Sequence, residues 1–273
     1  MKKNGFEEVL KKKVLAMIFE KSSTRTRVSF EVGMQKLGGY AIFLGKNDIQ
    51  LGRGETIEDT ALILSRYVDC IMYRAYSHND VLELAHHATV PVINGLDDQE
   101  HPCQVIADLM TVKEFKGELE GLHAVYFGDG DNNMAHSLLL GCTMVGTSIK
   151  IVSPKKYWPS SQYVEKAREM GRVEITEMEE NVAEDADVII TDTWISMGDE
   201  AEKEARLREF EGYTVNESIM KQAKDDAIFL HCLPAYYGKE VTKEVAYGKQ
   251  SVIFDEAENR MWAQMAILKW LLQ

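Results

Sequence analysis

The sequence is short of cysteine and proline, which excludes several classes of protein. Its 273 residues include only 4 cysteines and 5 prolines. Cys70, Cys103, Cys142 and Cys232 form no CxxC pair, so neither a zinc site nor a disulfide framework is indicated. No low-complexity tract or repeat of about 20–50 residues is visible. We therefore expect a globular protein of a reducing compartment, the cytoplasm, with no metal ligand set.

Long apolar runs are also missing. None approaches the roughly 18–20 residues that a membrane-spanning helix needs. The basic stretch Met1–Lys13 is followed by a short apolar run, Val14–Phe19, with no small-residue cleavage site after it. We expect neither a signal peptide nor a membrane span.

Positive charge is scarce as well. The chain has 31 Lys and Arg against 44 Asp and Glu, a formal net charge of -13. A nucleic-acid partner is not expected, because binding a phosphate backbone requires a basic surface. Any small anion must therefore be bound by a local group of positive charges.

What the sequence does contain is a regular alternation of short apolar runs with amphipathic stretches. This alternation predicts an α/β fold of two domains, each a parallel-sheet α/β sandwich. A polar, glycine-containing stretch at Lys116–Gly121 suggests the junction between domains 1–117 and 118–258, with the C-terminal helix 259–273 packing back on the first. The predicted strands are Val14–Phe19, Tyr40–Leu44, Cys70–Tyr73 and Val90–Asn94, then Leu122–Gly128, Ser148–Ser153, Val188–Thr191, Ile228–His231 and Val252–Asp255.

A hydroxyl- and arginine-rich turn follows the first predicted strand. Ser22–Arg27 reads SSTRTR and opens the predicted helix Thr24–Leu37. A helix N-terminus offers unpaired N–H groups and partial positive charge, and the arginine fork suits phosphate. The segment therefore predicts an anion site, although a simple N-cap with solvated arginines would use the same residues.

The STRTR turn followed by Val28-Ser29-Phe30-Glu31 resembles the carbamoyl-phosphate loop of the aspartate/ornithine carbamoyltransferase family. Further motifs follow in family order, and the resemblance extends from about Val14 to the C-terminus. It implies transfer of a carbamoyl group from carbamoyl phosphate to an amine, with no cofactor. The residues it assigns to carbamoyl phosphate are Ser23, Thr24, Arg25, Thr26, Gln50, Arg74, His101, Gln104, Cys232, Leu233 and Arg260.

The second-substrate residues follow later strands and resemble the ornithine-type members. Asp192-Thr193-Trp194-Ile195-Ser196-Met197-Gly198 carries the Ser-Met-Gly signature, and His231-Cys232-Leu233-Pro234 matches the HCLP motif. The resemblance implies that Asn133, Asp192, Ser196 and Met197 bind L-ornithine. Putrescine or another amine remains an alternative acceptor, and a non-catalytic binding protein an alternative from another class. The Gly128–Gly130 turn lacks a full GxGxxG, so a dinucleotide site is weakly indicated.

The resemblance also gives roles and an assembly. It implies that Arg74 and His101 stabilise the carbonyl oxygen, and that Asp192 and Cys232 handle the attacking amine. Cys232 is the preferred proton acceptor on this basis. Because Gln50 resembles a residue donated to a neighbouring subunit, we expect a homo-oligomer, a trimer or a multiple of trimers, with shared active sites.

Overall fold

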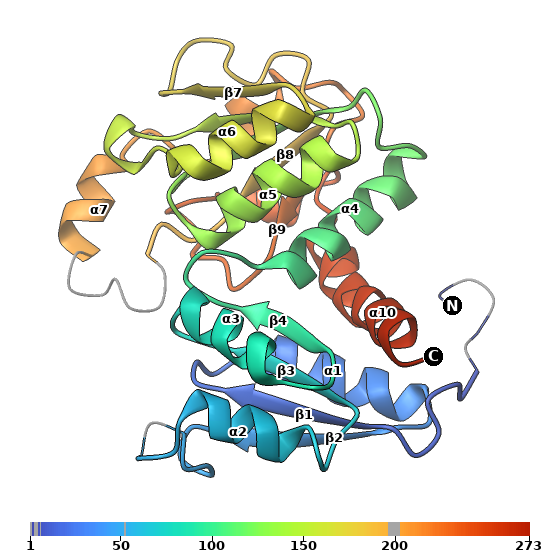
Figure 1. Ribbon diagram of the computed structural model, residues 1–273. Coiled ribbons are helices and arrows are strands. Elements are labelled where there is room, and N and C mark those ends of the chain that lie inside the picture. Colours follow the sequence, from blue (N-terminus) through green and yellow to red (C-terminus); the bar gives the residue numbers. More distant parts are fainter. Residues whose placement is uncertain (1, 3–4, 6, 52, 196–202) are drawn as a thin grey trace. The chain divides into compact units, whose positions relative to one another are not determined.

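The computed structural model describes residues 2, 5, 7–51, 53–195 and 203–273 (Figure 1). It divides into two compact units. The first comprises Met1–Cys103 and Glu258–Gln273, and the second comprises Gln104–Ala257. Within the described ranges, no helix is long and apolar enough to cross a membrane.

The first unit is built on a four-stranded sheet in the order β2-β1-β3-β4, with every pairing parallel. The strands are β1 (Val14–Phe19), β2 (Tyr40–Gly45), β3 (Cys70–Arg74) and β4 (Val92–Leu96). The strand order reverses direction between β1 and β3. In open α/β sheets, such a reversal leaves a crevice beyond the carboxyl ends of the two strands, where ligands bind.

Helices cover both faces of this sheet. Phe30 and Met34 of α1 (Thr24–Lys36) and Met265 and Leu268 of α10 (Ile253–Leu272) share one core with alternate residues of β1 and β3. Helices α2 (Ile57–Leu64) and α3 (His78–His87) pack in a separate core on the other residues of those strands. The predicted packing of the C-terminal helix on the first domain is thus confirmed.

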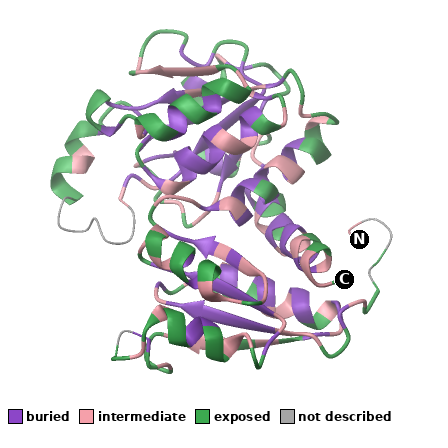
Figure 2. Ribbon diagram, viewed as in Figure 1, coloured by how far each residue is buried: buried purple, intermediate pink, exposed green. Residues whose placement is uncertain are grey.

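The second unit holds a five-stranded parallel sheet in the order β7-β6-β5-β8-β9. The chain order reverses between β5 and β8, which makes this pair the second expected ligand crevice. The strands are β5 (His123–Phe127), β6 (Ser148–Val152), β7 (Val173–Thr176), β8 (Val188–Thr191) and β9 (Ile228–His231). Figure 2 shows the strands mostly buried and the outer faces of the helices exposed.

Two cores flank the second sheet. One contains apolar residues of α4 (Pro102–Lys116), α5 (Asn133–Met144) and α6 (Ser161–Met170). The other contains apolar residues of α8 (Glu217–Met220) and α9 (Lys243–Ala246), with Phe210 and Tyr213 after α7 (Lys203–Glu209). A short 3-10 helix, η1, spans Lys155–Tyr157.

The two-domain parallel α/β prediction is confirmed, and one predicted strand is wrong. Val252–Asp255 enters helix α10, which begins at Ile253. The chain pairs with β9 only through a single bridge between Ser251 and Phe229, after which Asp255 and Glu256 lie in the first helical turn. A three-residue apolar run cannot distinguish a strand from a buried helix start. The sequence also missed β7, whose four residues are all only half-buried.

The two compact units divide between Cys103 and Gln104, at the start of α4. The domain junction at Lys116–Gly121, at the other end of that helix, stays a prediction. The units divide a second time between Ala257 and Glu258, inside α10. Because both crossings fall inside continuous helices, composition carries no signal for them.

Candidate active site

The anion loop of the first unit lies at the β1/β3 reversal. Ser23 is the N-cap of α1, and its Oγ accepts a hydrogen bond from the Thr26 backbone N–H (3.2 Å). Ser23 Oγ also donates to Thr26 Oγ1 (3.0 Å). Thr24 is exposed, Arg25 is half-buried and Thr26 is buried. The cap thus fixes the hydroxyl groups around the free N-terminus of α1, as an anion site requires.

Arg260 reaches this loop from α10. Its Nη2 donates to Thr26 Oγ1 (3.1 Å), although the two residues are 234 positions apart in the chain. Arg74, the last residue of β3, and Arg260 are both at most 5% exposed. Two buried guanidinium groups in a protein of net charge -13 form the local positive group that an anion requires.

His101 lies in the same positive environment, immediately before α4. Burial, and then the charges of Arg260, Arg74 and Arg25, hold the pKa of His101 well below its usual range. The imidazole is therefore neutral at neutral pH, so it can donate one hydrogen bond without adding charge. A neutral donor among three arginines suits a polarised carbonyl beside a phosphate.

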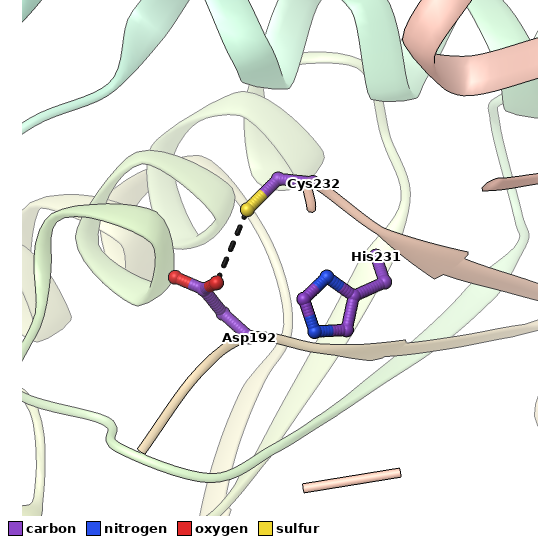
Figure 3. A group of neighbouring side chains, drawn as sticks. All are labelled: Asp192, His231 and Cys232. Carbon is purple, nitrogen blue, oxygen red and sulfur yellow. Dashed lines mark hydrogen bonds between the residues drawn. The ribbon is translucent and has the colours of Figure 1, made fainter. Parts of the chain in front are cut away.

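In the second unit, Asp192 directly follows β8 and Cys232 directly follows β9. Cys232 Sγ donates to Asp192 Oδ1 over 3.1 Å, and Figure 3 shows the thiol pointing toward the carboxylate. Burial raises the pKa of Asp192. Burial and then the negative charges of Asp192 and Glu256 raise the pKa of Cys232 well above its usual value. The pair is therefore a neutral thiol held by a carboxylate.

The imidazole of His231 completes this group (Figure 3). One ligand atom from each of Asp192, His231 and Cys232 lies within 4.8 Å of the others. Both ring nitrogens of His231 are engaged, because Nδ1 accepts from the Leu233 backbone N–H (2.9 Å) and Nε2 lies 3.3 Å from Glu240 Oε1. These bonds place the proton on Nε2 and aim the ring at the backbone turn. His231 thus orders the turn that carries Cys232.

A buried carboxylate network supports the same turn. Glu256 Oε2 accepts from the His231 backbone N–H (2.8 Å). Gln104 Nε2 donates to Glu256 Oε1 (2.9 Å) and to Asp108 Oδ1 (2.7 Å). Gln104 is only 1% exposed, and its amide N–H group joins the carboxylates of α4 and α10.

The β5–α5 turn lies at the reversal of the second sheet. Asn133 is the half-buried first residue of α5, and the Asn132 side chain caps that helix by accepting from the Ala135 N–H (2.8 Å). Buried Asp129 forms an ion pair with Arg206 of α7 at 2.5 Å. This ion pair joins the β5–α5 turn to the first described helix after Asp192.

The remaining predicted residues lie apart or cannot be placed. Gln50 is exposed in the connection between β2 and α2, and none of the contacts described above joins it to the anion loop or to the Asp192–Cys232 pair. Leu233 is half-buried with a φ of 58°, a left-handed conformation that costs a non-glycine residue energy. Ser196 and Met197 lie outside the described residues.

Several residues that organise these clusters escaped sequence analysis. His231, Glu240 and Glu256 order the Cys232 turn, and Arg206 pairs with Asp129. The histidine of HCLP was the one available signal, because it stands at a strand end beside a motif cysteine. The acidic partners gave none, since charged residues of α10 and of the turn after β9 look like solvated residues in the sequence.

Comparison with known proteins likewise distinguishes two parts of the chain. Residues 1–114 match the family model "Aspartate/ornithine carbamoyltransferase, carbamoyl-P binding domain", and residues 120–271 match its "Asp/Orn binding domain". An ornithine carbamoyltransferase from Oceanobacillus iheyensis is 54% identical, over 97% of this chain and 84% of its own. One from Picrophilus torridus is 52% identical, over 100% of this chain and 92% of its own. The solved ornithine carbamoyltransferase from Pyrococcus furiosus superimposes with a TM-score of 0.93 at 50% identity, over 97% of this chain and 86% of that one. This chain belongs to the aspartate/ornithine carbamoyltransferase family.

Proposed function

We propose that this protein transfers the carbamoyl group of carbamoyl phosphate to the δ-amine of L-ornithine, giving L-citrulline and phosphate. The observation that carries an amine acceptor is the Asp192–Cys232 pair at the ends of β8 and β9. A buried carboxylate is suited to the ammonium group of such a substrate. Relatives named ornithine carbamoyltransferase at 50–54% identity favour ornithine over putrescine, which has the same two amines but no carboxylate.

The carbamoyl donor is assigned to the first unit. Ser23, Thr24, Arg25 and Thr26 bind the phosphate at the N-terminus of α1, with Arg260 beside Thr26. Arg74 and His101 donate to the carbonyl oxygen as negative charge develops there. One well-placed donor of this kind contributes roughly 3–4 kcal/mol of transition-state stabilisation. The low pKa of His101 supports a neutral donor, which avoids crowding a fourth cation among three arginines.

The chemical step is attack of the neutral δ-amine on the carbonyl carbon. A C–N bond forms, the C–O bond to phosphate breaks, phosphate leaves with the bonding electrons, and nitrogen loses one proton. The raised pKa of Cys232 supports a protonated thiol, which cannot accept that proton. Asp192, whose pKa burial raises, is the better acceptor. This assignment departs from the sequence-based preference for Cys232, which instead orients the carboxylate.

The rest of the acceptor site and the assembly belong to the same proposal. Asn133, Ser196 and Met197 bind the amino acid part of ornithine, while Gln104, Leu233 and Cys232 contribute to the carbamoyl-phosphate site. Gln50 serves the site of a neighbouring subunit, so the active form is a cytoplasmic homotrimer or a multiple of trimers. The donor is already activated, so the reaction requires no cofactor.

An assay that detects the carbamoylated product of each amine, which is citrulline for ornithine, tests the proposal directly. Carbamoyl phosphate and purified protein are supplied with ornithine, putrescine or aspartate, and kcat/KM is measured for each amine. A site that binds the α-carboxylate of ornithine leaves polar groups unpaired when putrescine, which lacks that carboxylate, binds. We therefore expect ornithine to be preferred by about 10⁴-fold or more. Equal use of putrescine would refute ornithine as acceptor, and no product from any amine would refute the carbamoyltransferase activity.

A further inference from the structure

Asp97 is a buried carboxylate with no role in the site described above. It is 0% exposed and lies in the five-residue connection between β4 and α4 that ends at His101. Its Oδ1 accepts from the backbone N–H groups of Gln99 (2.8 Å) and Glu100 (2.7 Å). Its own N–H donates to the Glu100 carbonyl (3.0 Å). The carboxylate therefore closes the turn from inside and fixes the backbone directly before His101.

The second oxygen of Asp97 is tied to two other elements. Oδ2 accepts from Asn94 Nδ2 of β4 (2.8 Å) and lies 2.7 Å from His78 Nδ1, at the start of α3. The His78 backbone N–H also donates to Asp98 Oδ1 (2.7 Å). Four donors around one buried carboxylate compensate for its desolvation and leave it little freedom to move.

The same connection is joined to Arg74. The pairing of β3 with β4 shifts register between Tyr73 and Arg74, so that Arg74 lies opposite Leu96. Leu96 has a φ of 152°, a conformation that non-glycine residues rarely adopt. Its N–H donates to Asn94 Oδ1 (3.0 Å) and its carbonyl accepts from the Ala75 N–H (2.9 Å). Bulges of this kind re-aim side chains beside active sites.

We propose that Asp97, held by His78 and Asn94, positions His101 for the carbonyl oxygen of the carbamoyl donor; this inference rests on the proposed function. Asp97 touches no reacting atom in this assignment and acts through the backbone of residues 97–101. Loss of its hydrogen bonds lets the turn relax and moves the imidazole. The hydrogen bonds of Asp97 given above run to β4, α3 and its own turn, whereas the phosphate is assigned to the N-cap of α1 and Arg260.

The test separates the carbonyl from the phosphate. In Asp97→Asn an NH2 group replaces one of the two carboxylate oxygens, so the two donors that this oxygen accepts lose their acceptor. A displacement of about 1 Å at a catalytic group can cost on the order of 100-fold, so kcat/KM for carbamoyl phosphate should fall about 10–100-fold. The Kd for inorganic phosphate, measured by calorimetry, should change less than about threefold, because it probes the α1 loop and Arg260 rather than His101.

Two variants of His78 provide a rescue series. His78→Leu removes the N–H donor to Asp97 and should reproduce the loss. His78→Asn keeps a donor at the position of Nδ1 and should recover most of the activity. Asp69→Asn is the matched control, because Asp69 also accepts from a backbone N–H (Val14, 2.9 Å) and a side chain (Lys13, 2.9 Å), but at the amino ends of β1 and β3. It should lower stability and leave kcat/KM for carbamoyl phosphate unchanged.

Each outcome decides the inference. Unchanged kcat/KM in Asp97→Asn, or equal losses of carbamoyl phosphate and phosphate binding, would overturn it. If Asp97→Asn does not fold, His78→Leu and His78→Asn decide, and equal activities of the two would overturn it. If the wild type makes no citrulline, the proposed function itself fails. In that case the imidazole ¹⁵N chemical shifts of His101, assigned with the help of His101→Gln, test whether Asp97 positions this ring. The same shifts in wild type and in Asp97→Asn would refute the inference.

Discussion

Replacing Asp192 by asparagine removes one charge at the centre of the acceptor site and almost no volume. Cys232 Sγ donates to Asp192 Oδ1 over 3.1 Å, and an asparagine oxygen can still accept that bond. The Thr193 N–H, 2.7 Å from the same oxygen, also keeps its acceptor. The substitution should therefore preserve the turn and eliminate only the interaction with the substrate ammonium and the capacity to accept a proton.

The loss of activity can be estimated from the hydrogen bond. A hydrogen bond to a charged group contributes roughly 1.5–3 kcal/mol, because its loss leaves a buried charged group without its partner. Each 1.36 kcal/mol is a factor of ten, so the lost interaction alone should lower kcat/KM for ornithine about 10–150-fold, and the lost proton acceptor should lower it further. Affinity for carbamoyl phosphate should not change, because the residues assigned to its phosphate lie in the first unit.

The thermal stability of Asp192→Asn should not fall, although its activity does. Burial raises the pKa of Asp192, so the fold favours the protonated carboxyl. Stability contributed by such a group is present at low pH and lost as pH rises through the raised pKa. Above that pKa the ionised carboxylate is a buried charge, and asparagine relieves that cost. Asp192→Asn should therefore have an equal or higher Tm at pH 7, and this difference should vanish in acid.

The matched control is Asp187, at the opposite end of the same strand. Asp187 is 4% exposed, accepts from the His123 N–H (2.9 Å) and pairs with Lys224 (2.8 Å). Asp187→Asn should lower the free energy of unfolding by about 1–3 kcal/mol and leave ornithine kinetics unchanged. The reasoning is refuted if Asp192→Asn keeps ornithine kcat/KM within about threefold of wild type, or if it loses carbamoyl-phosphate affinity to the same extent.

Three further predictions concern the anion loop, the assembly and the thiols. Arg25→Ala should weaken carbamoyl phosphate and slow turnover while the Tm stays near wild type, because the residue lies in the first turn of α1; calorimetry with unchanged affinity would exclude the phosphate loop. Mixing inactive Gln50→Ala subunits with inactive Arg25→Ala subunits should restore part of the citrulline activity, and no recovery under demonstrated subunit exchange would argue against shared sites. Burial raises the pKa of Cys103 to about 11 and that of Cys232 well above its ordinary value. Iodoacetamide at pH 8 should therefore react slowly with the native protein, whereas in urea it should react with all 4 cysteines. Rapid labelling of Cys232 in the native protein would contradict its assignment as a neutral thiol.

The strand–helix pattern carried most of the fold because parallel α/β units have strong local signals. The strand Val14–Phe19 and the helix that begins at Thr24 were placed correctly. The strand predicted at residues 252–255 is wrong because the chain pairs with β9 through only a single bridge, a tertiary contact that the local sequence does not reveal. The half-buried β7 lacks the apolar density that marks the inner strands.

The positions of the candidate site residues followed from the same pattern. Arg74 and Asp192 each stand at the carboxyl end of a predicted strand, and the strand orders 2-1-3-4 and 7-6-5-8-9 put those ends at the two reversals. A parallel sheet therefore gathers residues that are far apart in the chain, and the strand ends indicate where to look. The sequence cannot give the partners that hold them. Gln104 and Glu256 are hydrogen-bonded across 152 positions, and nothing in the local sequence of Glu256 marks it as the partner of Gln104.

The Cys232 turn shows why motif and environment must be read together. The motif identifies the thiol as a site residue, and a thiolate would be the stronger base for an amine. Burial beside Asp192 and Glu256 acts against ionisation, since each added negative charge raises the pKa further. The buried neutral thiol then has one strong use, as a donor that orients Asp192. Because sulfur is a weak donor compared with oxygen, Cys232→Ser should keep this orientation and retain much more activity than Asp192→Asn. Equal losses in the two variants would show that the thiol takes part in proton transfer.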